Sequence, residues 1–83
     1  MKINKIACSL LGIEETDDPR RILAVSIYKS DLKAVDRALK RRIAQIYAHP
    51  NGSSQDAKEV IIYLESIANN LKTLLLKNNI TVD

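Results

Sequence analysis

Apolar residues recur every three or four positions along most of the chain, which is the spacing of an amphipathic helix. The first such stripe lies within residues 2–12 and comprises Ile3, Ile6, Ala7, Leu10 and Leu11. Gly12 is a suitable residue for ending this helix, and an acidic, polar link follows over residues 14–18. The pattern therefore predicts one short N-terminal helix and a connection with no apolar stripe of its own.

A second helix start is predicted at the pair Asp18-Pro19. The Asp18 carboxylate can accept hydrogen bonds from free backbone N–H groups, and proline suits the first helical position. The helix that follows, over residues 20–25, has about two turns, so it needs packing against other elements to be stable.

A longer helix is predicted next, with Ser30 or Asp31 as its cap and its last residue near Ala48. Pro50 ends it because the residue before a proline avoids helical geometry. The apolar stripe of this helix is Leu32, Val35, Leu39, Ile43 and Ile46.

The last helix follows a polar loop over residues 51–54. Ser54 can cap it, and Asp56 lies in its first turn. We expect it to extend to about Lys77 and to fray beyond that residue. Its apolar stripe is Ile61, Leu64, Ile67, Ala68, Leu71, Leu74 and Leu75.

These elements predict an all-α fold, a small helical domain in which an antiparallel hairpin of two long helices is covered by two short N-terminal helices. The chain has 83 residues, which suits one domain, and only 2 glycines and 2 prolines, which disfavours a turn-rich β fold. We divide it into a short N-terminal helix and acidic link over 1–18, a helical domain over 19–78 and a tail over 79–83.

The positive charge of the chain is concentrated in the third predicted helix. The whole chain has 13 Lys and Arg against 10 Asp and Glu, a net charge of +3. That helix contains five of the cations and two of the acids, so it alone carries the net charge and the remainder is balanced. Lys33, Arg37, Lys40 and Arg41 span about 100° of the helical wheel, opposite the stripe around Leu39.

Three interpretations of this basic face stay open at this point: a solvated surface, a docking surface for an acidic protein, or a nucleic-acid contact. Clustered Lys and Arg suit phosphates. Base recognition usually adds aromatic or polar side chains, and this helix offers only Tyr47 and Gln45.

Composition excludes several other classes. A single cysteine, Cys8, forms no internal disulfide, and one Cys with one His does not build a zinc site. No apolar run approaches the roughly 20 residues of a membrane span, and no secretory signal is expected. We therefore expect a cytoplasmic protein with no metal and no cofactor. Cys8 should be an inert, partly buried thiol, and the three tyrosines should fill core edges with their hydroxyls outward.

His49 is the single candidate for a general base. No Ser or Cys is placed by the sequence for activation by it, and no acid is placed to orient it. A role in capping the helix or fixing the loop before Pro50 is favoured over a partner contact. We therefore expect no enzymatic activity.

The order of these features resembles the J-domain, the helical module of DnaJ-type co-chaperones, over about residues 19–77. An Ile22-Leu23-Ala24-Val25 stretch precedes the basic helix, and His49-Pro50-Asn51 follows it. Ala57, Ile61, Leu64 and Leu71 then lie on the last helix, after this loop. In that family the first stretch is Ile-Leu-Gly-Val-like and the loop is His-Pro-Asp. The family's basic helix has an Ala-Tyr-Arg-like centre, and this chain has Ala38-Leu39-Lys40 at that position. The chain is similar to degenerate J-like segments of planctomycete-type bacterial proteins.

The resemblance implies a protein-docking module whose partner is a heat-shock ATPase chaperone or a larger assembly. Its docking surface would comprise Lys33, Arg37, Lys40, Arg41, His49, Pro50 and Asn51. The family's aspartate is central to stimulating the ATPase, and Asn51 lacks its charge, so weak stimulation is implied. The alternative is a small nucleic-acid-binding protein that uses the same basic helix. Self-association also stays open.

Overall fold

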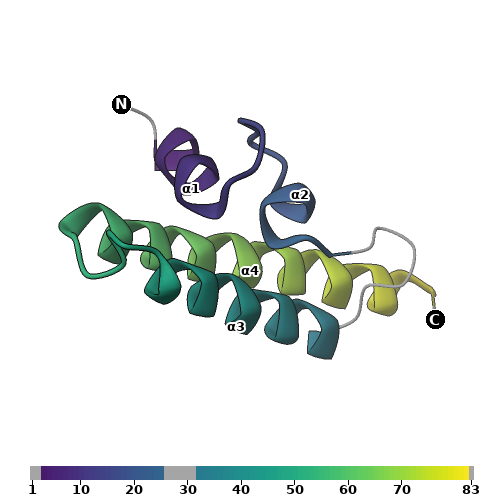
Figure 1. The fold of residues 1–83 in the computed structure, drawn as a ribbon. Helices are drawn as coiled ribbons and strands as arrows, with labels where there is room; N and C mark the ends of the chain where they lie inside the picture. The colour runs from purple at the N-terminus through teal and green to yellow at the C-terminus, as the bar shows by residue number, and fades with distance from the viewer. Residues whose placement is uncertain (1–2, 26–31, 83) are drawn as a thin grey trace.

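Four helices account for most of residues 3–25 and 32–82, the parts of the chain that the computed structural model describes, with side chains described as far as residue 77 (Figure 1). They are α1 (Ile3–Leu11), α2 (Pro19–Leu23), α3 (Leu32–Ala48) and α4 (Gln55–Val82). No strand occurs in these two ranges, so the predicted all-α class is confirmed. The caps predicted at Ser30 or Asp31, together with Tyr28, lie outside the described residues.

α3 and α4 lie side by side, because the chain turns back on itself through residues 49–54 (Figure 1). α3 buries Val35, Ala38 and Ile46 completely. α4 buries a longer row against it: Ala57, Val60, Leu64, Ile67, Ala68 and Leu71. Since α4 has 28 residues and α3 has 17, the last turns of α4 extend beyond the start of α3 (Figure 1).

α1 and α2 both lie on one side of the α3–α4 pair (Figure 1). α1 adds Ala7 and Cys8 to the core, and α2 adds Ile22 and Leu23, all at most 1% exposed. The opposite side of the pair has no helix over it among the described residues. Cys8 is more deeply buried than expected, and its thiol donates to the Thr16 carbonyl oxygen at 3.6 Å.

The start of α2 is as predicted. Asp18 Oδ1 accepts a hydrogen bond from the Arg20 backbone N–H at 3.0 Å, and Pro19 occupies the first turn. The helix ends at Leu23, two residues before the predicted end, because Ala24 adopts the left-handed conformation with φ 59° and ψ 46°. A residue in this conformation turns the chain out of the helix axis, so Val25 lies beyond the helix.

α4 differs from its prediction at the C-terminal end. It continues to Val82 instead of ending near Lys77, because each further residue of an established helix adds one backbone hydrogen bond. Leu74, placed in the apolar stripe, is 50% exposed. Leu32 of α3 is likewise at the surface, at 36% exposure. Periodicity identifies the apolar face of a helix but not how far the neighbouring helices cover it.

Candidate docking surface

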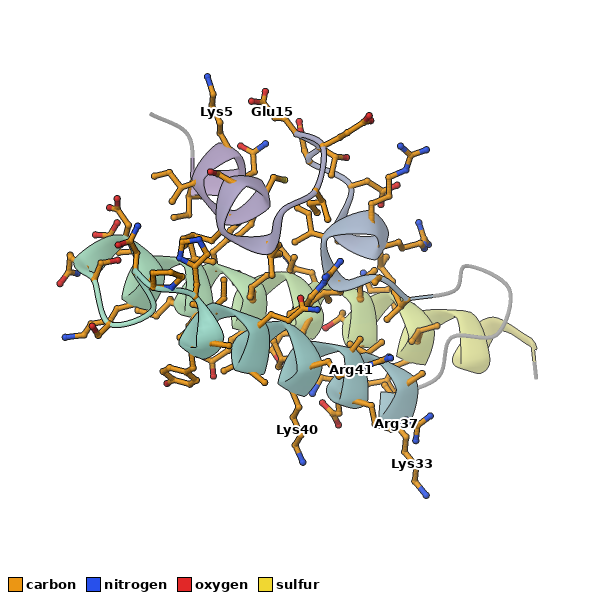
Figure 2. The ribbon with its side chains drawn as sticks, in the orientation of Figure 1. Lys5, Glu15, Lys33, Arg37, Lys40 and Arg41 are labelled. Atoms are coloured by element: carbon orange, nitrogen blue, oxygen red, sulfur yellow. The ribbon has the colours of Figure 1, made fainter. Side chains whose placement is uncertain are left out.

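Three cations of α3 form a basic strip, defined here as Lys33, Arg37 and Lys40. All three are exposed and point from α3 away from α1 and α2 (Figure 2). None of them forms a hydrogen bond or ion pair within the described part of the chain. Like charges at three- and four-residue spacing repel one another, so an acidic partner would relieve an unfavourable interaction that the monomer keeps.

The acid nearest to this strip in the sequence is neutralised elsewhere. Asp36 Oδ1 accepts from Lys72 Nζ of α4 at 2.8 Å, and both side chains are partly exposed. This ion pair joins α3 to α4 and takes Asp36 away from its neighbours on α3. Asp36 therefore forms no ion pair with a cation of the basic strip.

Arg41, the fourth predicted cation, is separated from the basic strip. It lines a small hollow together with Leu23 and Ala24 at the end of α2, and with Arg42 and Gln45 of α3. At 100° per residue Arg41 stands at the edge of the predicted face, and the packing of α2 beside that edge gives it different neighbours. The structure thus places three of the four predicted cations on one surface and the fourth in a hollow.

Arg42 has a structural role that the sequence did not reveal. Its Nε donates to the Ile22 carbonyl oxygen at 2.8 Å and its Nη1 donates to Gln45 Oε1 at 2.7 Å. The guanidinium thereby holds the last turn of α2 against α3. Partial burial and, secondarily, the charge of Arg41 lower the pKa of Arg42. The sequence signal for this structural role is the position of Arg42 on the core side of the helical wheel.

The turn over residues 49–54 is held by a dense set of hydrogen bonds. His49 Nδ1 accepts from the Asn51 backbone N–H at 3.0 Å, which is the loop-fixing role predicted for this histidine. The Gly52 N–H donates to the His49 carbonyl oxygen at 2.8 Å. Ser54 Oγ donates to the Asn51 carbonyl oxygen at 2.7 Å and accepts from the Ala57 N–H at 3.2 Å, so Ser54 caps α4 as predicted.

The three residues of the predicted His-Pro-Asn loop face two different grooves. His49 and Pro50 line a groove of about 430 Å³ with Tyr47, Gly52, Ser53, Lys58 and Ile61. Asn51 lines another, of about 440 Å³, on the side of α1, with Lys5, Ile6, Ser9, Leu10, Ser54 and Asp56. The Asn51 side-chain amide has no hydrogen-bond partner in the described ranges, so it is available to a ligand or partner there.

Tyr47 is a surface residue that the sequence interpretation placed wrongly. It is 68% exposed and does not fill a core edge. It follows Lys40 by seven residues, two helical turns, so both lie on the same face of α3. Tyr63, in contrast, is half-buried, and desolvation, followed by the nearby Cys8 and Asp17, raises its pKa. Tyr47 therefore continues the basic strip toward the groove at His49 and Pro50.

Other chemistry is limited in the described residues. No group of three or more His, Cys, Asp or Glu side chains there could hold a metal ion. Within the same ranges, no helix combines the length and the apolar character needed to cross a bilayer. Comparisons with protein-family models, with curated proteins and with solved structures find no match to this chain.

Proposed function

We propose that this chain is a non-catalytic protein-interaction module, resembling a J-domain, that docks on an acidic protein surface. The observation that carries this proposal is the basic strip: three exposed cations at helical spacing, none of which has a hydrogen bond or ion pair among the described residues. Tyr47 and the groove at His49 and Pro50 continue this surface and supply apolar contact area. Charged residues of this kind steer association and fix orientation, and an aromatic side chain adds buried area.

Two structural features support the J-domain-like part of the proposal. The first is the course of the chain, in which α4 returns along α3 after a His-Pro-Asn turn and two short helices precede them. The second is Ala24, which adopts a left-handed conformation at the position where the family has glycine. Glycine is the residue that this conformation favours, so the backbone there is of the kind that an Ile-Leu-Gly-Val-like stretch would need.

The partner that the resemblance suggests is a heat-shock ATPase chaperone. Asn51 offers a neutral amide where the family has a carboxylate, and hydrogen bonds to charged groups are roughly twice as strong as neutral ones. We therefore expect docking with weak stimulation of ATP hydrolysis. His49 acts in this scheme as a positioning residue, since its Nδ1 is occupied by the Asn51 N–H.

Charge-reversal variants test the docking surface directly. Lys33→Glu combined with Lys40→Glu should weaken chaperone binding by about tenfold or more, because both cations leave the same surface. Arg20→Glu combined with Arg21→Glu is the matched control: both are exposed cations of α2, outside the basic strip and the two grooves at the turn, so this equal change in charge should alter binding less than about twofold. Equal losses in the two variants would contradict docking through the basic strip.

Chemical-shift mapping identifies the class of partner. The labelled protein is titrated with the chaperone and, separately, with short duplex DNA and RNA. Shifts of α3 and residues 49–52 with the chaperone alone are the expected result. Shifts with nucleic acid alone, with affinity falling steeply between about 50 and 200 mM salt, would replace the proposal by the nucleic-acid alternative.

Asn51→Asp separates docking from stimulation. It should raise the chaperone's ATPase rate above that with the wild-type chain while leaving affinity similar. Full stimulation by the wild-type chain, with no gain from Asn51→Asp, would show that the carboxylate is dispensable here.

A further inference from the structure

The hollow at the end of α2 has an unusual chemical composition. It has a volume of about 70 Å³ and is lined by Leu23, Ala24, Arg41, Arg42 and Gln45. Two of its five residues are therefore permanent cations, and none is an acid. A half-buried cation is usually paired with a carboxylate or another anion, because desolvating an unpaired charge is costly.

Arg42 has no such anion within the described residues. Its two hydrogen bonds go to neutral acceptors, the Ile22 carbonyl oxygen at 2.8 Å and Gln45 Oε1 at 2.7 Å. Partial burial and the neighbouring Arg41 charge both lower its pKa, which means that the site disfavours the positive charge it holds. The negative charge of an anion in the hollow would oppose both effects, because an opposite charge nearby favours the charged form of the guanidinium.

The remaining groups around the hollow are hydrogen-bond donors. Arg41 forms no hydrogen bond or ion pair in the described part of the chain, so its guanidinium is free. Because Gln45 uses its Oε1 to accept from Arg42, its amide NH₂ group is left as a donor. Leu23 and Ala24 form the apolar part of the lining, and an apolar neighbour strengthens electrostatic contacts.

We propose that this hollow binds one carboxylate group, supplied by an acidic side chain of the docking partner. The volume suits a single small group, and the planar guanidinium edge matches a carboxylate with two parallel N–H···O bonds. This inference rests on the proposed docking function and deepens it. The basic strip attracts an acidic surface over a distance, and the hollow receives one side chain of that surface and fixes its register.

Acetate is a probe for the hollow that needs no partner. We expect saturable shifts of the Arg42 Nε–Hε and Gln45 NH₂ resonances when sodium acetate replaces sodium chloride at constant ionic strength. The Kd should be on the order of tens of millimolar. Arg41→Gln should weaken binding by about fivefold or more, because it removes a charged donor from the site. Lys77→Gln removes one positive charge from an exposed site on α4, outside both the hollow and the basic strip, and should change the Kd less than about twofold.

Gln45→Glu places a carboxylate of the chain itself beside Arg42 at the same side-chain length. It should abolish acetate binding and raise the Tm by about 2–5 °C through a new ion pair with a half-buried cation. This variant tests anion binding in the hollow without a substitution of Arg42, whose loss would remove the hydrogen bond that holds α2 against α3.

Each contrary outcome overturns the inference. Shifts that do not saturate, equal weakening by Lys77→Gln and Arg41→Gln, or retained acetate binding in Gln45→Glu would show that the hollow is not a carboxylate site. Inorganic phosphate binding about tenfold tighter than acetate would assign the hollow to phosphate instead. Because these experiments use no partner protein, their failure would leave the Lys33 and Lys40 tests of docking unaffected.

Discussion

The chain leaves a helix at the end of α2 and again at the turn after α3, and the residues at these two junctions suit their backbone positions to different degrees. At the end of α2 the left-handed position is held by Ala24, with φ 59°. In the turn, Gly52 is buried, and a Cβ there would press on the Ile46 carbonyl oxygen and lie 2.9 Å from the Tyr47 carbonyl oxygen. Ala24 carries a side chain although its backbone conformation disfavours one, whereas there is no space for a side chain at Gly52.

This difference separates a strained junction from a relaxed one. A left-handed residue that carries a Cβ costs roughly 1–2 kcal/mol, and such strain persists when the surroundings enforce it. Here Ile22 and Leu23 are buried, and Arg42 binds the Ile22 carbonyl oxygen. The turn needs no such help, because hydrogen bonds within it join His49 to the Gly52 and Asn51 N–H groups and Ser54 to the Asn51 carbonyl oxygen. The rigid turn presents His49 and Pro50, whereas Ala24 lines the proposed carboxylate hollow.

Gly52→Ala should produce the largest loss of stability among these variants. The added methyl group meets backbone carbonyl oxygens, which cannot rotate away, so the free energy of unfolding should fall by about 3 kcal/mol. Chemical denaturation measures it. Gly12→Ala is the comparison: Gly12 has φ +70° but nothing within 4 Å of an added Cβ, and the cost there should be about 1 kcal/mol. Similar losses at both positions would mean that backbone conformation, and not steric fit, selects glycine in the turn.

Ser54→Ala tests the hydrogen bonds of the same turn. It removes the oxygen that accepts from the Ala57 N–H and donates to the Asn51 carbonyl oxygen. Loss of an N-cap of this kind costs about 1 kcal/mol, which a shift in the denaturation midpoint would report. Ser53→Ala, one residue earlier at an exposed position with no such bond, should have no measurable effect. A matching loss at Ser53 would attribute the effect to the composition of the loop instead of the cap.

Ala24→Gly should stabilise the protein, which is the opposite sign from most glycine substitutions. Relief of the left-handed strain outweighs the greater flexibility of glycine in the unfolded chain, so a gain of about 0.5–1 kcal/mol is expected. Ala44→Gly, at an exposed site within α3, should instead cost about 1 kcal/mol. A loss of stability in both variants would mean that the end of α2 carries no strain.

The helices and their caps could be predicted from the sequence because they depend on local rules. Asp18 and Ser54 stand directly before the helices that they cap and accept from backbone N–H groups two and three residues later. Pro50 ends α3 through its own ring. The left-handed turn at Ala24 could not be predicted in this way, because alanine shows no preference for it. Its conformation follows from the burial of Ile22 and Leu23 and from Arg42, which lies 20 residues away from Ile22 in the sequence.

The candidate site could be predicted only in part for the same reason. Helical spacing located the exposed Lys33, Arg37 and Lys40, since a face opposite an apolar stripe is determined by one helix alone. The separate environment of Arg41 depends on where α2 packs, and the pairing of Asp36 with Lys72 depends on α4. Tyr47 was placed at a core edge because tyrosines usually lie there. Its exposure follows from the absence of a described helix over that side of α3.

Tyr47→Ala should have the smallest effect on stability and a clear effect on docking. A side chain that is 68% exposed loses little buried area on truncation, so the free energy of unfolding should change by less than about 0.5 kcal/mol. The same ring lines the groove at His49 and Pro50 and shares a face of α3 with Lys40. Aromatic residues contribute strongly to protein interfaces. Chaperone affinity should therefore fall by about fivefold or more, measured by calorimetry on the two proteins. Ile62→Ala removes an equally exposed apolar residue of α4, at 66%, that does not line the groove, and it should leave affinity unchanged. If Ile62→Ala weakened binding as much as Tyr47→Ala, the contact surface would lie on α4 and the rigid turn would not direct the partner.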